Sequence, residues 1–193
     1  MRFQAIFCLL LLAPALFCGA EATGWATHEN PKFTYKLEYP ADWQVKQLAE
    51  SGWFEASSQM DKASLPNTFR VEVVPLDEEV LDFTAFMDRG DDDLLSDLKK
   101  ENPSLDSKAV RISSSQEISL GTHRAHRIDF SYPLYGALNL RAIRVQVPYQ
   151  KMLYTLTCSA EETWYFEQVE ADFEAIITSF KIQRPNQDYL DNY

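Results

Sequence analysis

The sequence contains little cysteine. Three cysteines occur among 193 residues, and two of them, Cys8 and Cys18, lie in an apolar N-terminal stretch. Cys158 is the only thiol beyond that stretch. The remainder of the chain can therefore form no internal disulfide and must be stabilised by its core. Cys158 ends an alternating apolar run, and we interpret it as a small buried hydrophobic residue rather than a catalytic thiolate.

Positive charge is also scarce. The chain carries 18 lysine and arginine residues against 29 aspartate and glutamate residues, which gives a formal net charge of −11. A chain this acidic is repelled by phosphate backbones and by anionic lipid, so we expect no nucleic acid partner. Downstream of the N-terminal stretch no apolar run is long enough to span a membrane, so no membrane span is expected.

Common catalytic signatures are missing. The sequence has no G-x-S-x-G, no H-E-x-x-H, no P-loop and no G-x-G-x-x-G. His123 and His126 lie an odd number of positions apart on a predicted strand, so their side chains point to opposite faces and cannot share one metal ion. We expect His126, which is in phase with Ile128, to be buried and hydrogen-bonded. The sequence thus predicts a non-enzymatic protein with no catalytic residue, no cofactor and no metal site.

The first 22 residues have the pattern of a secretory signal peptide. Arg2 precedes an apolar run from 5 to 17, and Ala20-Glu21-Ala22 provides the small residues of a cleavage site. We predict cleavage after Ala22 and export to the periplasm or the extracellular space. Lipidation at Cys18 is the alternative, but the bulky Phe17 stands where a lipidation signal has a small residue.

Periodicity divides the rest of the chain into strands and two helices. A polar lead-in at 23–31 and a flexible acidic tail at 183–193 flank the periodic region. Two-residue alternation predicts strands over 33–39, 43–45, 52–56, 69–73, 108–120, 123–132, 138–147 and 152–158. In the seventh of these strands the apolar residues change phase, which predicts a β-bulge near Ala142.

Helical periodicity covers two segments. The first, 82–100, contains Gly90, which leaves open whether it forms one helix or two shorter pieces. The second, 159–180, begins with Ser159 and Glu162, which have the spacing of a capping box. Its apolar stripe is centred on Phe173, which we expect to be a core residue.

This order of elements predicts an α+β fold. Short connections between the last four strands favour hairpins, so we expect a largely antiparallel sheet flanked by helices. The length between 23 and 182 suits a single domain. Trp43, beside the turn at Pro40, is expected to anchor one end of the core.

Three segments resemble a known family. They are FTYKLEYPADWQV at 33–45, GTHRAHRIDFSY at 121–132 and YTLTCSAEETWYFEQVEADFEAIITSFKI at 154–182. Together they resemble PsbP-like domains, and the chain is also similar to DcrB-like bacterial envelope proteins. The resemblance implies a PsbP-like α/β/α sandwich and a non-enzymatic binding or assembly role. Because the chain has a simple secretory signal and no long transit peptide, a bacterial periplasmic relative is expected and no photosynthetic role is carried over.

Two kinds of contact surface can be read from the residues. The densest acidic run comprises Asp88, Asp91, Asp92 and Asp93. With helical spacing, Asp88 and Asp92 lie one turn apart and share a face. Such a face suits a basic partner, which we expect to be another envelope protein, although a solvated helix surface has the same pattern.

Aromatic residues offer a second hypothesis. Five of them could line a pocket for a small ligand at one end of the sheet: Trp43, Trp53, Tyr132, Tyr135 and Tyr149. Surplus aromatic residues more often belong to a core. We therefore favour an exported interaction or assembly module, and the alternative is a small-ligand carrier.

Overall fold

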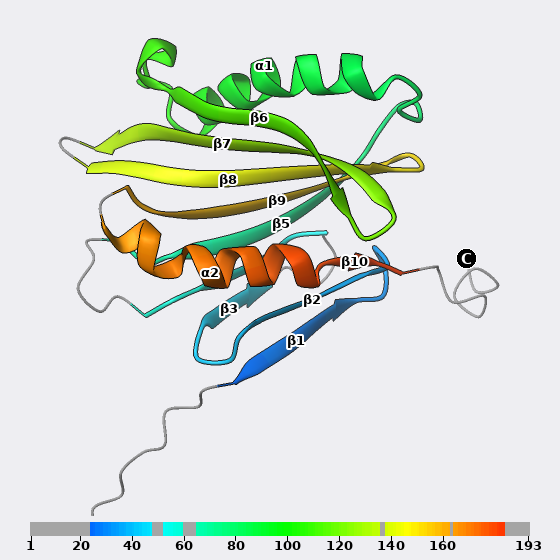
Figure 1. Ribbon diagram of the computed structural model, residues 1–193, viewed down its shortest axis with the longest axis horizontal. Coiled ribbons are helices and arrows are strands. Elements are labelled where there is room, and N and C mark those ends of the chain that lie inside the picture. Colours follow the sequence, from blue (N-terminus) through cyan, green and yellow to red (C-terminus); the bar gives the residue numbers. More distant parts are fainter. Residues whose placement is uncertain (1–23, 48–51, 60–64, 136–137, 163, 184–193) are drawn as a thin grey trace, which may run out of the picture.

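The computed structural model describes residues 24–47, 52–59, 65–135, 138–162 and 164–183 (Figure 1). The predicted signal peptide lies outside these described residues, as does all of the predicted tail beyond Gln183.

Seven antiparallel strands form the main sheet, in the order β3-β4-β5-β9-β8-β7-β6. Every strand that the sequence predicts is present, with its ends shifted by a few residues. The strands of this sheet are β3 (Gln44–Gln47), β4 (Phe54–Ser57), β5 (Thr68–Pro75), β6 (Arg111–Leu120), β7 (His123–Tyr135), β8 (Leu138–Tyr149) and β9 (Met152–Glu161). The last four form successive hairpins, as the short connections predict. Gly121, which opens the two-residue turn between β6 and β7, has a φ of +62°, a conformation that glycine adopts without strain.

A small second sheet was not expected. It comprises β1 (Trp25–Asn30), β2 (Tyr35–Pro40) and β10 (Lys181–Ile182). The prediction of a polar lead-in at 23–31 was wrong, because β1 pairs with β2 along its whole length. Its inward positions include the polar residues His28 and Asn30, so no apolar alternation marks the strand. The His28 ring stacks on Phe54 at a centroid distance of 4.0 Å, which compensates for its burial.

The first helix, α1 (Phe83–Glu101), is continuous. Asp82 caps it by accepting a hydrogen bond from the Ala85 amide at 3.0 Å. Gly90 does not break the helix, because its missing side chain makes room for the His126 ring: a Cβ there would lie 2.6 Å from His126 Nδ1. A single 3₁₀ turn, η1 (Ser107–Ala109), follows α1 and leads into β6.

The second helix, α2 (Trp164–Ser179), begins later than the capping-box pattern predicts. Ser159 does not cap it, because β9 continues through Glu161 and pairs that residue with Leu140 of β8. The Ser159 hydroxyl instead hydrogen-bonds to the Thr68 hydroxyl at 2.7 Å across the sheet. The long-range strand pairing therefore overrides the local capping signal.

The predicted bulge near Ala142 is absent. The register of β8 runs without a break through Ala142 on both sides, and the register shifts lie instead between Ile112 and Ser114 and between Pro133 and Tyr135. Every residue from Ala142 to Val147 is buried. The apolar residues change phase because both faces of β8 are covered, a pattern that a one-sided sheet would produce only with a bulge.

The main sheet is covered on both faces, in three layers (Figure 1). Helix α1 packs on one face, where a compact cluster contains Leu94, Leu98, Leu105, Ile128, Phe130 and Ala142. Helix α2 and the small sheet pack on the other face, over a larger cluster that includes Tyr35, Leu37, Trp43, Phe54, Phe69, Phe166 and Phe173. Trp43 meets Phe173 edge to face at a centroid distance of 6.2 Å, so the predicted core anchor is confirmed. Among the described residues, no helix has the length and hydropathy of a membrane span.

Replacing Phe173 with alanine should lower the free energy of unfolding by about 3–5 kcal/mol, because the ring is fully buried and its loss leaves a cavity. The measurement is chemical denaturation of the purified variant. Thr178→Ala, an exposed change on the same helix, is the control and should change stability by about 0.5 kcal/mol or less. An unchanged midpoint for Phe173→Ala would mean that α2 does not cover the sheet.

Replacing Gly90 with alanine should destabilise the protein although alanine favours helix. The new methyl group would meet the His126 ring, and overpacking of this kind costs about 1–3 kcal/mol against a gain in helix propensity of about 1 kcal/mol. Thermal unfolding provides the test, with the exposed Thr84→Ala in the same helix as the control. A higher melting temperature for Gly90→Ala would show that α1 does not press on His126.

Candidate functional site

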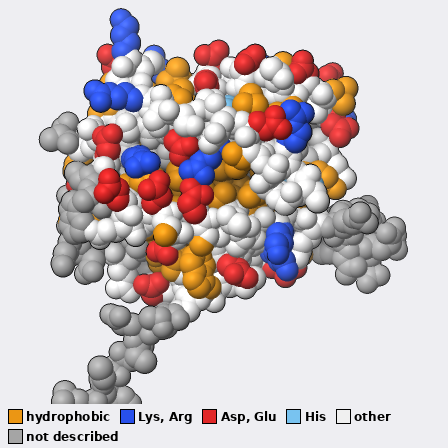
Figure 2. Space-filling view, viewed as in Figure 1, with side chains coloured by type: hydrophobic (Ala, Val, Ile, Leu, Met, Phe, Trp, Pro, Cys, Tyr) orange, Lys and Arg blue, Asp and Glu red, His pale blue; other side chains and the backbone are white. Residues whose placement is uncertain are grey.

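The acidic residues of α1 do not form one uniform surface. Asp88, Asp92 and Asp93 are exposed, whereas Asp91 is half-buried and turned toward the sheet. Asp91 accepts a hydrogen bond from the Ser115 hydroxyl of β6 at 3.1 Å. Figure 2 shows acidic side chains along the rim of the molecule that α1 forms. Three of the four predicted contact residues therefore face solvent, and the fourth helps to attach the helix to β6.

Several acidic side chains of the helices are paired with arginines of the sheet. Four such pairs, with nitrogen–oxygen distances from 2.7 to 3.2 Å, join the helices to the sheet: Asp97–Arg144, Glu101–Arg70, Glu170–Arg141 and Glu174–Arg127. Asp88 and Asp92, by contrast, form no ion pair within 4.0 Å in the described part of the chain. The helix flank that includes Asp88 and Asp92 thus carries negative charge that no neighbouring cation within 4.0 Å neutralises among the described residues.

His126 lies beneath this flank and is fully buried, as its place in the strand predicts. Its Nε2 atom is 2.8 Å from the Ser115 hydroxyl and 3.9 Å from the nearer Asp91 carboxylate oxygen. Burial lowers the pKa of His126, and the negative charge of Asp91 opposes this shift only in part. The ring is therefore neutral near pH 7.

Ser115, His126 and Asp91 are the three residue types of a hydrolase triad, but their arrangement differs from that of a triad. A triad needs the carboxylate on the ring nitrogen opposite the one that faces the serine. In this cluster Asp91 approaches the same nitrogen as Ser115 and also binds the serine hydroxyl directly. The His126 Nδ1 atom faces Gly90 instead. The arrangement fastens α1 to β6 and β7 and leaves no carboxylate to orient the histidine as a base.

The other residues singled out for chemistry are separated from this cluster. His123 lies with its ring 4.7 Å from that of Tyr149, so it does not approach His126. No group of three or more histidine, cysteine or carboxylate side chains within the described ranges could hold a metal ion. Cys158 is fully buried, and burial raises the pKa of its thiol well above the ordinary value, which keeps it protonated.

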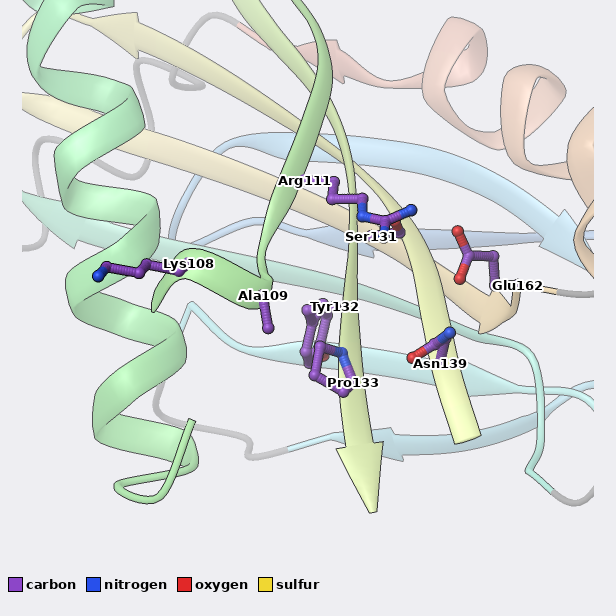
Figure 3. A pocket seen from close by; sticks show the side chains of 8 residues that line it. All are labelled: Lys108, Ala109, Arg111, Ser131, Tyr132, Pro133, Asn139 and Glu162. Carbon is purple, nitrogen blue, oxygen red and sulfur yellow. The ribbon is translucent and has the colours of Figure 1, made fainter. Parts of the chain in front are cut away.

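A polar pocket opens near the end of the sheet where β6 begins (Figure 3). It has a volume of about 220 Å³. Figure 3 shows the Arg111 and Glu162 side chains pointing toward one another across it, with Asn139 and Tyr132 nearby, whereas Lys108 extends away. No local sequence pattern predicts this grouping, because its residues come from η1, β6, β7, β8 and the turn after β9.

The described aromatic side chains of the carrier hypothesis do not gather around one cavity. Tyr132 lines the polar pocket and stacks on Phe130, on the α1 side of the sheet. Trp43 and Tyr149 pack against the larger core on the other side. Trp53 is half-buried, at the turn into β4, and the side chain of Tyr135 lies outside the part that the structure describes. Only Tyr132 among the described side chains of this set lines that pocket.

The buried histidines make stability depend on pH. Burial lowers the pKa of both His28 and His126 below the ordinary value of 6.5. Below pH 6.5 the unfolded chain therefore binds protons that the folded chain does not, and the free energy of unfolding should fall as the pH is lowered from 7 to 5.5. Urea denaturation across this range measures the slope. His126→Gln should flatten it, and an equal slope in the variant would contradict the role given to His126.

Comparison with known proteins gives a family and a fold. The family model described as PsbP-like protein matches residues 21–182. A search of curated proteins found no match. Among solved structures, cyanobacterial PsbP (CyanoP) from Synechocystis sp. PCC 6803 aligns with a TM-score of 0.63 and 13% identity, over 85% of this chain and 95% of that protein.

Two further structures share the architecture at low identity. LpqN from Mycobacterium tuberculosis aligns with a TM-score of 0.52 and 15% identity, over 85% of this chain and 88% of that one. PA94 from Pseudomonas aeruginosa aligns with a TM-score of 0.54 and 13% identity, over 84% of this chain and 99% of that one. At such identities the likeness shows the fold, and the family rests on the match to residues 21–182: this chain belongs to the PsbP-like family.

Proposed function

We propose that the protein is an exported, non-enzymatic interaction or assembly module that binds a basic segment of another envelope protein. The observation that carries this proposal is the unmatched acidic flank of α1, formed by Asp88 and Asp92 with Asp93 beside them. Four other acids at the helix–sheet contacts are neutralised by arginines, whereas this flank keeps two carboxylates, one turn apart, that form no ion pair among the described residues. A surface of this kind attracts and orients a basic partner.

The interior supports a surface role over an enzymatic one. Both faces of the main sheet are filled by packed side chains. The cluster of Ser115, His126 and Asp91 has the composition of a catalytic site without its geometry. Membership in the PsbP-like family fits the same reading, since the resemblance implies a binding or assembly role.

Export is supported by the pattern of the first 22 residues, with the mature chain beginning at Thr23. One protein of similar fold, LpqN, is described as involved in cell envelope biogenesis. An envelope protein as partner would be consistent with both observations.

The charge hypothesis predicts a salt-sensitive loss of binding when Asp88, Asp92 and Asp93 are all changed to asparagine. Each exposed charge pair contributes about 0.2–1 kcal/mol, so the triple variant should bind about tenfold more weakly at low salt. The partner is first identified by pull-down from envelope extract. Affinity is then measured with the purified partner at low and moderate salt, where screening should reduce the difference.

The matched control for this experiment removes the same number of charges from another exposed acidic run. Asp77, Glu78 and Glu79 precede α1 and are all exposed, so their change to amides alters net charge equally. If both triple variants bind alike, the α1 flank is only a solvated surface.

A second candidate function is the binding of a small polar ligand in the pocket of Figure 3. The facing guanidinium and carboxylate of Arg111 and Glu162 favour it, together with Tyr132 as an aromatic wall. A ligand with both a negative and a positive group would fit these side chains. The pocket is polar, so it differs from the aromatic-lined cavity that the carrier hypothesis expects.

A further inference from the structure

Strand β6 forms one edge of the main sheet. It stands last in the strand order, and among the described strands only β7 pairs with it. It is ten residues long, and most of its side chains are exposed. A sheet edge presents a row of unpaired backbone amide and carbonyl groups, to which another extended segment can add.

The hairpin geometry identifies the free backbone groups. Leu120 pairs with His123 across the two-residue turn, and such a turn is closed by a hydrogen-bonded pair. In an antiparallel ladder, hydrogen-bonded and non-hydrogen-bonded pairs then alternate. The amides and carbonyls of Ser119, Glu117 and Ser115 therefore point away from β7, toward the open edge.

From Ser114 to Leu120 this edge lacks the proline, lysine and bulges that commonly protect a sheet edge against strand addition. Natural edges are blocked by proline, by lysine, by bulges or by a covering element. Residues 111–120 contain no proline and no lysine, and the register shift lies at the start of the strand, between Ile112 and Ser114. The remaining positions are mostly serine, glutamine and glutamate. These polar side chains limit self-association but leave the backbone amide and carbonyl groups accessible.

The α1 flank defines the chemistry of a strand that would add here. Ser115 contacts Asp91, so the side chains of Ser115 and Glu117 lie on the α1 side of β6. Asp88, one turn before Asp91, lies on the same flank of the helix. An added strand would run about 4.8 Å beyond β6. Beside Ser115, its residues on the α1 side would therefore meet the negative charge of Asp88 and Asp91, whereas Glu117 further along is already paired with Arg124. Its residues on the other side would lie beside the half-buried Ile118, which packs against the larger core.

We propose that β6 accepts an extended segment of a partner protein as an additional antiparallel or parallel strand, with lysine or arginine at alternate positions facing α1 and small apolar residues between them. This inference rests on the proposed function and specifies its mode of binding. A second copy of this chain does not fit the edge, because two acidic flanks would be brought together.

The probe is a synthetic ten-residue peptide that alternates lysine with valine, and its binding to the purified protein from residue 23 onward is measured by titration calorimetry. The decisive pair of variants is Glu117→Pro and Glu117→Thr. Both remove the ion pair with Arg124, but only proline removes the outward amide, and proline is tolerated at a sheet edge. The proline variant should bind at least about tenfold more weakly than the threonine variant, through loss of the backbone hydrogen bond and a clash at the edge.

Two further peptides separate backbone pairing from simple charge attraction. A copy with alternate backbone nitrogens methylated should not bind, and a copy with glutamate in place of lysine should not bind. Amide hydrogen exchange of the wild-type protein should slow at Ser115, Glu117 and Ser119 when the lysine peptide is present. Equal binding by Glu117→Pro and Glu117→Thr, or by the methylated peptide, would overturn strand addition.

Two controls test whether the proline variant is folded and whether the protein associates with itself. If Glu117→Pro unfolds, the pair Ser119→Pro and Ser119→Thr repeats the comparison at the next outward amide. A dimer in light scattering that Glu117→Pro abolishes would overturn the choice of a basic partner strand. If the envelope partner binds wild type and Glu117→Pro equally, the strand-addition mode fails while the proposed function stands. If no partner responds to the charge of α1, the proposed function itself fails.

Discussion

The structure depends on the burial of its central strands from both sides. Strand β8 has six consecutive buried residues, from Ala142 to Val147, and this is possible only because α1 covers one face of the sheet while α2 and the small sheet cover the other. Apolar burial is the main favourable contribution to folding, so removing either cover would expose one side of the same strands. The core clusters on the two faces therefore share the same central strands.

Double coverage also determines where polar groups can lie. Buried strands carry Arg144 and Asp129 at positions that face the helices, and each is paired, with Asp97 and with Arg127. The hydrogen bond to Asp129, with a smaller contribution from the one to Glu174, raises the pKa of the Arg127 guanidinium. Because a buried charge without a partner is costly, both Arg144 and Asp129 are matched. On the outer flank of α1, by contrast, Asp88 and Asp92 form no ion pair among the described residues.

The same architecture leaves the lateral edge of the sheet open. Helices cover the faces of a sheet, but the backbone groups of the last strand stay free unless something pairs with them. In this protein the free edge of β6 and the acidic flank of α1 are neighbours, joined by the contact of Ser115 with Asp91. The proposed docking of a basic strand rests on that adjacency.

The sequence by itself determined what local periodicity encodes: the eight expected strands, the two helices, the buried positions of Phe173 and His126, and the resemblance that the family match confirms. Only the tertiary structure decided the rest. Strand β1 is held by its pairing with β2 and by the stacking of His28 on Phe54. Strand β9 continues past the predicted helix start at Ser159 because it pairs with β8. Strand β6 is an edge because of the order of strands in the sheet. These features depend on contacts between residues far apart in the chain, which no local pattern of apolar and polar residues records.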